Sequence, residues 1–179
     1  MINDGVSLVK IQRDALVNDD YMKWSKNLLN NVSWLNEGSR KVSYHGRHPY
    51  KYNGGNHQPK TDLAFLDDVL NFVNKKYKQR FNSILLNQYK TGKNKLGWHS
   101  DDEAELGRDP TIASLSFGSA RAMWFKNKQT GVNVKCELRG GDFLIMSKAT
   151  QHHWLHSISA SESMDSRISL TFREIKVAV

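Results

Sequence analysis

The chain has 179 residues, of which 39% are hydrophobic, and it carries a net charge of +8. This length suffices for one well-buried core and is short for two ordinary domains, so we expect a single domain over residues 1–179. The absence of long apolar runs, low-complexity blocks and repeats excludes a membrane-spanning helix, a disordered chain and a solenoid. The N-terminal residues lack a signal-peptide layout and Cys136 is the only cysteine. We therefore expect an intracellular protein, cytoplasmic or nuclear, that is monomeric and not attached to a membrane.

The positive charge is clustered along the chain. The groups are Arg40, Lys41, Arg47 and Lys51; Lys75, Lys76, Lys78 and Arg80; and Lys90, Lys93 and Lys95. Such clusters favour a polyanionic partner such as a nucleic acid. Surface lysines that merely keep a protein soluble give a similar composition, so charge by itself leaves both interpretations open.

Amphipathic periodicity predicts two helices in the first half of the chain. The first begins near Asp19 and Asp20, which can act as N-cap residues. Its apolar stripe consists of Tyr21, Trp24, Leu28 and Val32. The second is capped by Thr61 or Asp62 and has a longer stripe. That stripe consists of Leu63, Leu66, Val69, Leu70, Val73 and Tyr77. Residues 38–60 hold Gly and Pro among aromatic residues, so an irregular segment is expected between the helices.

After residue 80 the pattern changes to short β-type runs separated by Gly, Asn, Asp and Ser. The predicted strands are Phe81 to Tyr89, Thr111 to Phe117, Ala122 to Lys126, Val132 to Leu138, Asp142 to Met146 and Arg167 to Phe172. Helices followed by several short strands indicate an α+β fold with a sheet sandwich or barrel. We expect the active site to lie inside that barrel.

The stretch "GWHSDDEAEL" places His99 and Asp101 two residues apart. In extended backbone such residues share a face, so an imidazole and a carboxylate can reach one ion. An Fe(II) centre that also binds a cosubstrate and O₂ uses two His and one carboxylate on one triangular face. The third ligand is then a distant histidine, and the candidates are His152, His153 and His156. An HxD pair is also common in solvated turns, so it needs support from other motifs.

Two further motifs give that support. In "RISLTFR", apolar residues alternate with Arg167, Ser169, Thr171 and Arg173, which gives the strand an apolar face and a polar face. The arginines either face solvent or line a pocket for a small dicarboxylate. In "NQY", Asn87 and Tyr89 likewise share one face and can offer an amide and a phenol to the same ligand.

Together these motifs resemble the AlkB family of Fe(II)- and 2-oxoglutarate-dependent nucleic-acid demethylases. The resemblance runs over residues 39–174 through "YHGRHPYKYNGG", "LNQYKTGKNKLGWHSDDEAEL", "PTIASLSFGSARAMWF", "GGDFLIMSKATQHHWLHSI" and "RISLTFRE". The subgroup that acts on DNA and RNA bases is nearest, because HxDDExEL followed by IASxSFG is typical there. The resemblance implies a double-stranded β-helix, or jelly-roll, core over residues 81–174. It also implies an N-terminal helix and a nucleotide-recognition lid within residues 1–60.

The resemblance also implies roles for individual residues. The implied iron ligands are His99, Asp101 and His156. The residues implied to contact 2-oxoglutarate are Asn87, Tyr89, Arg167, Ser169 and Arg173. Arg167 would pair with one carboxylate and Arg173 would help hold the other end. Most relatives carry Asn where this chain has Ser169, so one hydrogen bond to the cosubstrate differs, whereas both arginines are kept.

Substrate residues transfer less directly. In this family a lid aromatic and the first iron-ligating histidine sandwich the flipped base, which makes Tyr52 the matching aromatic and Tyr50 a second lid residue. These tyrosines can instead be core aromatics beneath the irregular segment. Glu103 matches an acidic residue that reads the exocyclic amino group of the base, and its alternative is a solvated loop carboxylate.

The implied reaction is oxidative demethylation of N1-methyladenine or N3-methylcytosine in DNA or RNA. It converts 2-oxoglutarate and O₂ to succinate and CO₂ and releases formaldehyde. Single strands are the expected substrate, because "NNVSWLNEGSRK" is shorter than the lid of relatives that probe duplexes. Two alternatives remain open. One is a related enzyme that oxidises a protein side chain or a small metabolite, and the other is a non-catalytic nucleic-acid-binding module.

Overall fold

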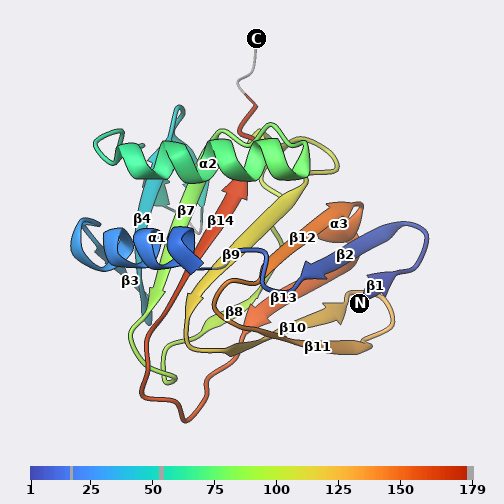
Figure 1. The fold of residues 1–179 in the computed structure, drawn as a ribbon. Coiled ribbons are helices and arrows are strands. Elements are labelled where there is room, and N and C mark those ends of the chain that lie inside the picture. Colours follow the sequence, from blue (N-terminus) through green and yellow to red (C-terminus); the bar gives the residue numbers. More distant parts are fainter. Residues whose placement is uncertain (17, 53–54, 177–179) are drawn as a thin grey trace.

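The structure is a computed structural model that describes residues 1–16, 18–52 and 55–176, without the side chains of Asn18 and Tyr52. Two antiparallel sheets face each other, and the helices cover the outer face of the larger one (Figure 1). Among the described residues, the large sheet has eight strands in the spatial order β1 (Ile2–Asn3), β2 (Ser7–Gln12), β12 (Phe143–Lys148), β9 (Ile112–Gly118), β14 (Arg167–Arg173), β7 (Ser83–Tyr89), β4 (Arg40–Gly46) and β3 (Leu35–Glu37). The small sheet has the order β11 (Asn133–Leu138), β10 (Arg121–Asn127), β13 (Trp154–Ile158) and β8 (Leu96–His99). A separate hairpin pairs β5 (Tyr50–Tyr52) with β6 (Gly55–His57).

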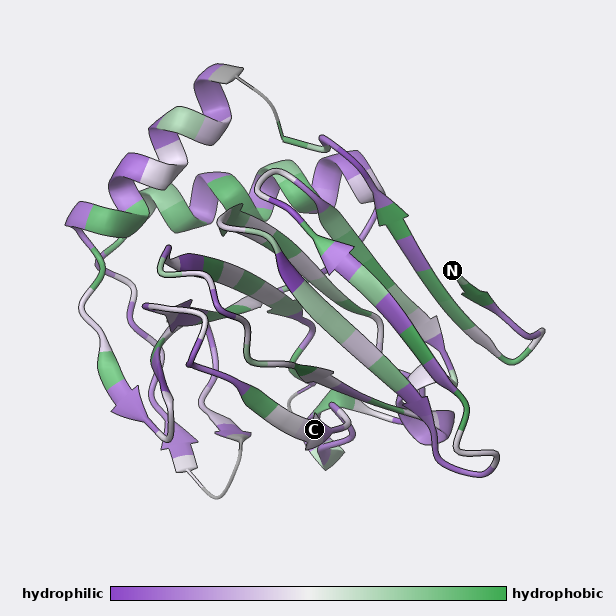
Figure 2. Cartoon of the chain, turned by 90° about the horizontal axis from the view of Figure 1, so that it is seen from below, coloured by the Kyte–Doolittle hydropathy of each residue, from purple (hydrophilic) through white to green (hydrophobic). Residues whose placement is uncertain are grey.

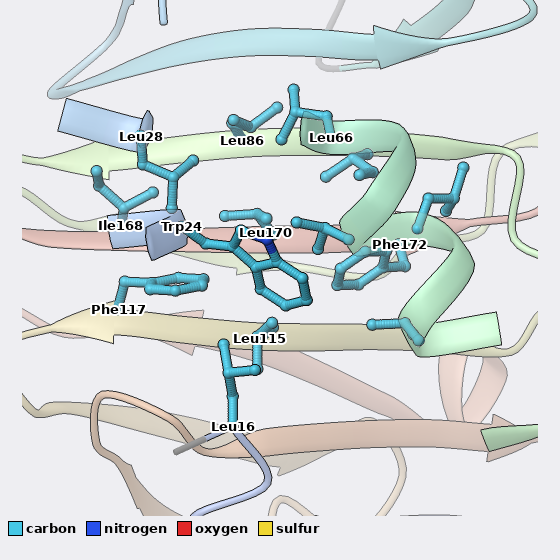
Figure 3. Close-up of a cluster of buried hydrophobic side chains, with 14 of the residues drawn as sticks. Leu16, Trp24, Leu28, Leu66, Leu86, Leu115, Phe117, Ile168, Leu170 and Phe172 are labelled. Atoms are coloured by element: carbon cyan, nitrogen blue, oxygen red, sulfur yellow. The ribbon is translucent and has the colours of Figure 1, made fainter. Parts of the chain in front are cut away.

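Two longer helices, α1 (Asn18–Asn30) and α2 (Ala64–Tyr77), lie across the outer face of the large sheet. Their apolar stripes meet the outward-facing residues of β7, β9 and β14 in one hydrophobic cluster. Figure 3 shows Trp24 of α1 in the middle of this cluster, with Leu28 beside it and Leu115 and Leu170 of the sheet next to it. The amphipathic periodicity therefore identifies the faces that the helices bury.

The central strands are buried on both sides, and their two faces serve different purposes. Along β7, Ile84 and Leu86 face the helices, whereas Leu85 and Tyr89 face the interior between the sheets. The same alternation of hydrophobic and hydrophilic residues appears as bands along the strands in Figure 2. Since side chains alternate along a strand, one sequence run can build the core on one face and a polar site on the other. This arrangement is the double-stranded β-helix expected from the resemblance.

Six predicted strands are present, as β7, β9, β10, β11, β12 and β14, each within two residues of the expected bounds. The prediction of an irregular segment over residues 38–60 is wrong. Arg40–Gly46 forms β4, which pairs with β7 from Lys41 opposite Gln88 to Gly46 opposite Ser83. Gly46 ends β4 and Gly55 begins β6, and Gly38 has a positive φ of 56° in the turn before β4. They therefore mark turns between short strands.

The helix ends also differ from the prediction. In α2, Leu63 occupies the N-cap position without a side-chain capping bond, so neither Thr61 nor Asp62 caps this helix. α1 begins at Asn18, which puts Asp19 and Asp20 in its first turn, where their charges still suit the helix dipole. Val32 lies beyond the end of α1 and packs in the core from a loop.

Strands β1, β2, β8 and β13 are absent from the sequence prediction. β2 extends the large sheet by pairing with β12, so the N-terminal segment contributes to the same sheet as the later strands. β8 and β13 complete the small sheet. Among the described residues, no helix is both long enough and apolar enough to cross a membrane.

Candidate active site

The predicted metal ligands come from two paired strands of the small sheet. His99 ends β8, Asp101 follows two residues later, and His156 lies in β13 directly opposite His99. One ligand atom from each residue lies within 4.8 Å of the others. Asp101 is completely buried and His156 is 6% exposed, so the group opens into the interior between the sheets. Two imidazoles and one carboxylate in this arrangement match the facial set used by non-haem Fe(II).

The other two candidate histidines point elsewhere. His152 and His153 belong to the short helix α3 (Thr150–His153) that precedes β13. The Nε2 atom of His152 contacts the carbonyl oxygen of Arg108 and lies 3.4 Å from Asp109. His153 is exposed. The paired strands therefore select His156 from the three candidates.

Neighbouring groups fix the protonation and direction of these ligands. Arg173 donates from Nη2 to both carboxylate oxygens of Asp101, each at 3.0 Å. Burial alone would raise the pKa of Asp101, but the charge of Arg173, followed by those of His156 and His99, lowers it. Burial, followed by the charge of His99, lowers the pKa of His156 to about 3. A carboxylate and a neutral imidazole are the forms that bind a metal ion.

Backbone contacts complete the support of this group. The Nδ1 atom of His99 lies 2.9 Å from the carbonyl oxygen of Gly97, which fixes the ring. The backbone N–H of Asp101 donates to the fully buried Gln151 side chain at 2.9 Å. Such outer contacts orient metal ligands and set their basicity. The sequence motifs do not predict this contact of Gln151, whose only sequence signal is its place in "TQHHWLH".

Arg167 faces the interior rather than solvent, which decides between the two interpretations of "RISLTFR". It is 1% exposed and donates from Nη2 to the Ser116 hydroxyl at 3.1 Å. The Nε and Nη1 atoms of Arg167 are buried without a hydrogen-bond partner among the described residues. No carboxylate of the described residues forms an ion pair with the Arg167 guanidinium. A buried guanidinium with unused donors is costly unless an anion completes it. The cavity beside it is also lined by the three candidate metal ligands, so an anion bound to Arg167 would lie in the same cavity as the metal.

Asn87, Tyr89 and Ser169 lie on the walls of the same cavity. β14 pairs with β7 so that Ser169 is opposite Asn87 and Arg167 is opposite Tyr89. The carbonyl oxygen of the Asn87 side chain accepts a hydrogen bond from Arg40 Nε at 2.8 Å, which orients its amide. Tyr89 is buried, and burial raises its pKa, so the phenol stays protonated. The sequence motifs do not predict this orienting role of Arg40, because residues 38–60 are expected to form an irregular segment.

The three predicted substrate residues have different settings. Tyr50 in β5 is completely buried, with its ring 5.1 Å from the guanidinium of Arg173. This matches the core-aromatic alternative for Tyr50. Glu103 is partly buried, and burial, followed by the charge of Asp101, raises its pKa. The side chain of Tyr52 lies outside the described residues.

Comparison with known proteins assigns this arrangement to a family. The family described as "2OG-Fe(II) oxygenase superfamily" matches residues 2–173. Human "Alpha-ketoglutarate-dependent dioxygenase alkB homolog 3" is 36% identical over 147 residues, which cover 76% of this chain and 51% of the relative. Human "DNA oxidative demethylase ALKBH2" is 34% identical over 135 residues, which cover 70% of this chain and 52% of the relative. The chain belongs to the AlkB family of 2OG-Fe(II) oxygenases.

The AlkB fold is also found by structural comparison. The solved structure titled "The structure of OsALKBH1" has a TM-score of 0.68 and 17% sequence identity, with 93% of this chain and 97% of that chain covered. This confirms the jelly-roll architecture. The expected Fe(II), 2-oxoglutarate and O₂ agree with the AlkB assignment, and the grouping of His99, Asp101 and His156 supports the metal among them. The chain spans about half the length of the curated AlkB relatives that it matches.

Proposed function

We propose that this AlkB-family chain is a dioxygenase that removes N-linked methyl groups from bases in DNA or RNA, above all N1-methyladenine and N3-methylcytosine. The observation that carries the proposal is the His99, Asp101 and His156 group beside the buried, unsatisfied guanidinium of Arg167. The names of the two human relatives agree with it. As part of this proposal, residues 1–179 act as one catalytic domain with a jelly-roll core over 81–174 and the base-recognition lid within 1–60.

Each side chain in the cavity has a separate task. His99, Asp101 and His156 would hold Fe(II), and Arg167 would bind one carboxylate of 2-oxoglutarate. Asn87, Tyr89 and Ser169 would shape the cavity around the cosubstrate. When bound, Fe(II) with 2-oxoglutarate and O₂ supplies the oxidation of an N-methyl group, whose hydroxymethyl product releases formaldehyde. Arg173 keeps Asp101 ionised by its two hydrogen bonds and so keeps a ligand ready for the metal.

Glu103 is our candidate for recognising the damaged base. Methylation at N1 of adenine or N3 of cytosine adds a positive charge and blocks pairing, so the lesion is easier to flip and attracts a carboxylate. Glu103 lies two residues after a metal ligand, next to Tyr50. Tyr52 is the aromatic residue that we propose to stack on the flipped base, and the buried Tyr50 would support the lid from the core side.

The net charge of +8 supports a nucleic-acid partner over a neutral peptide or metabolite. We propose that single strands are preferred and that the enzyme works as a monomer. Its nucleic-acid substrate would place it in the cytoplasm or nucleus.

A direct assay tests the function. Protein is incubated with Fe(II), 2-oxoglutarate and an N1-methyladenine oligonucleotide, and the oligonucleotide mass and succinate are measured. We expect loss of the methyl group together with succinate formation, and no reaction with His99→Ala. His153→Ala, which alters a neighbouring exposed histidine, serves as the matched control and should remain active. If the oligonucleotide stays unchanged while a methylated peptide reacts, the nucleic-acid assignment fails.

A further inference from the structure

A polar hollow lies beside the pair of strands β4 and β7, apart from the cosubstrate cavity. Its volume is about 170 Å³. The side chains that line it include those of Asn36, Ser39, Lys41, Gln88, Lys90 and Asn94. We call it the Lys41–Lys90 hollow. Its charged residues are the two lysines and Arg40, whose guanidinium is paired with Glu37, so the hollow has the character of an anion site.

The register of the sheet brings the two lysines together. Lys41 of β4 is directly opposite Gln88 of β7, and Lys90 lies two residues after Gln88, on the same side of the sheet. Both side chains line the hollow, and the charge of Lys90 lowers the pKa of Lys41. Among the residues that the structure describes, no carboxylate forms an ion pair with either lysine. Two like charges that line one hollow repel each other, and an anion between them offsets this repulsion.

The wall formed by the turn before β4 is firmly attached to the loop after β7. Ser39 donates from its hydroxyl to the Lys95 carbonyl oxygen at 2.7 Å and accepts from the Lys95 N–H at 2.9 Å. The Asn94 side chain donates to the Ser39 carbonyl oxygen and accepts from the Thr91 N–H. The hollow is therefore held in shape by bonds between segments far apart in the sequence.

Arg121 holds the same loop from below. It is 1% exposed and donates from Nη2 to the carbonyl oxygens of Gly92 at 3.2 Å and Asn94 at 2.6 Å. The same group donates to Ser159 in the chain beyond β13 at 2.5 Å. The hydrogen bonds from this buried guanidinium to the loop carbonyls hold the wall of the hollow in place before a ligand binds. Less conformational entropy of the loop is then lost on binding.

The hollow is also connected to the proposed active site. Arg40 lines the hollow and donates to Asn87, which lines the cosubstrate cavity. The loop that forms the wall leads directly into β8, which ends at His99. An anion in the hollow thus lies beside the loop from which β8 begins.

We propose that the Lys41–Lys90 hollow binds a backbone phosphate of the nucleic-acid strand whose methylated base is in the active site. The inference rests on the proposed function, because it takes the anion from that substrate. A phosphate between the two ammonium groups accepts from both and offsets their repulsion. The side-chain amide groups of Asn36 and Gln88 can donate to its remaining oxygens.

Lysine footprinting tests the site on the intact protein. The wild-type chain is acetylated with a water-soluble reagent, alone or with an unmodified single-stranded oligonucleotide or inorganic phosphate, and each lysine is quantified by mass spectrometry. We expect the oligonucleotide to protect Lys41 and Lys90 and to leave the exposed Lys10 and Lys26 reactive. Protection by inorganic phosphate but not by the oligonucleotide would identify a free-anion site and overturn the inference. Equal protection of all four lysines would overturn it as well.

A double variant gives the quantitative test. For Lys41→Gln/Lys90→Gln we expect roughly tenfold weaker oligonucleotide binding, as for the loss of charge-assisted hydrogen bonds, and a raised KM for the methylated oligonucleotide. The slope of log affinity against log salt should become shallower by about 0.7, the value for one phosphate contact on a single strand. Lys10→Gln/Lys26→Gln has the same charge change and should keep the wild-type slope. Wild-type affinity and slope in the Lys41/Lys90 variant contradict the inference.

The two proposals fail in different ways. If the methylated oligonucleotide is demethylated and the Lys41/Lys90 variant behaves like wild type, the phosphate site is wrong and the proposed function stands. If the lysines are protected but the methyl group is never removed, the site binds nucleic acid and the proposed reaction is wrong.

Discussion

Arg167 is the residue whose state in the structure most directly demands a ligand. Its buried Nε and Nη1 atoms lack partners among the described residues, so Arg167→Met removes an uncompensated charge as well as a binding group. We expect the half-saturating 2-oxoglutarate concentration to rise roughly 10- to 100-fold, because charged hydrogen bonds are lost. In the absence of 2-oxoglutarate the free energy of unfolding should rise by about 1 to 4 kcal/mol, since an apolar side chain of similar volume suits the site. Succinate formation and urea unfolding measure the two effects.

The iron requirement separates this role from a general loss of structure. Arg167→Met should change the half-saturating Fe(II) concentration far less than that of 2-oxoglutarate. Arg139→Met, at an exposed ion pair with Glu137, provides the control and should change neither. An equal rise for Fe(II) and 2-oxoglutarate argues against Arg167 as the carboxylate partner.

Arg173 differs from Arg167, because its buried guanidinium is paired with the carboxylate of Asp101. Arg173→Met leaves the completely buried Asp101 carboxylate without its two hydrogen bonds. We expect the free energy of unfolding of the metal-free protein to fall by about 3 to 5 kcal/mol, as for one partner removed from a buried ion pair. Urea denaturation measures this change. The same substitution at Arg139 should cost at most about 1 kcal/mol, and a similar cost at both positions would rule out a structural role for the Arg173–Asp101 pair.

The loop between β7 and β8 depends on close backbone approach. A Cβ added at Gly92 would lie 2.3 Å from the Ser161 carbonyl oxygen, whereas a Cβ at Gly97 meets nothing within 4 Å. We therefore expect Gly92→Ala to cost about 1 to 3 kcal/mol and to speed amide exchange across residues 90–95, because the loop must move away from residues 161–163. Gly97→Ala should change neither measurement. Equal exchange in both variants would show that the close approach does not hold the loop.

The periodicity of single elements carries much of the fold. Alternation in "RISLTFR" predicts β14, and the amphipathic stripe over residues 63–77 predicts α2. The face of β14 that points inward is not decided by alternation, because a strand with an apolar and a polar face fits either orientation. Only the helices packed on Ile168, Leu170 and Phe172 turn the arginines toward the interior. Strand β4 was missed because "RKVSYHG" offers few apolar residues, and its burial comes from pairing with β7.

Part of the candidate site can likewise be predicted from local sequence patterns, and part depends on the pairing of distant strands. The HxD spacing and the two arginines are local patterns, so they can be read from the chain. Whether His152, His153 or His156 completes the metal group depends on the register of β13 against β8, which puts His156 opposite His99. Arg40 and Gln151 act through hydrogen bonds to residues 47 and 50 positions away. Contacts at such separations have no sequence periodicity, so they cannot be predicted from one chain.

The molecule as a whole joins its two sheets at the candidate site. The small sheet supplies His99 and His156, and the large sheet supplies Asn87, Arg167 and Arg173. The Arg173–Asp101 pair joins an arginine of the large sheet to a metal ligand. A ligand set that spans both sheets should therefore stabilise the global fold as well as the cavity.

This arrangement predicts coupled stabilisation by metal and cosubstrate. Under anaerobic conditions, Fe(II) and 2-oxoglutarate together, each at about 100 times its Kd, should raise the unfolding midpoint by roughly 10 to 20 °C, because each ligand binds only the folded chain and so adds about 2.7 kcal/mol to its stability. Differential scanning fluorimetry measures the shift. 2-Oxoglutarate alone should give a smaller shift, since only the Arg167 end of its site is complete, and the difference reports the coupling free energy. His99→Ala should lose the coupling, whereas His153→Ala, which keeps both sheets' ligands, should retain it. If His99→Ala gains as much from the pair as wild type does, the ligands do not meet at the junction of the sheets, and the metal assignment of His99 fails with it.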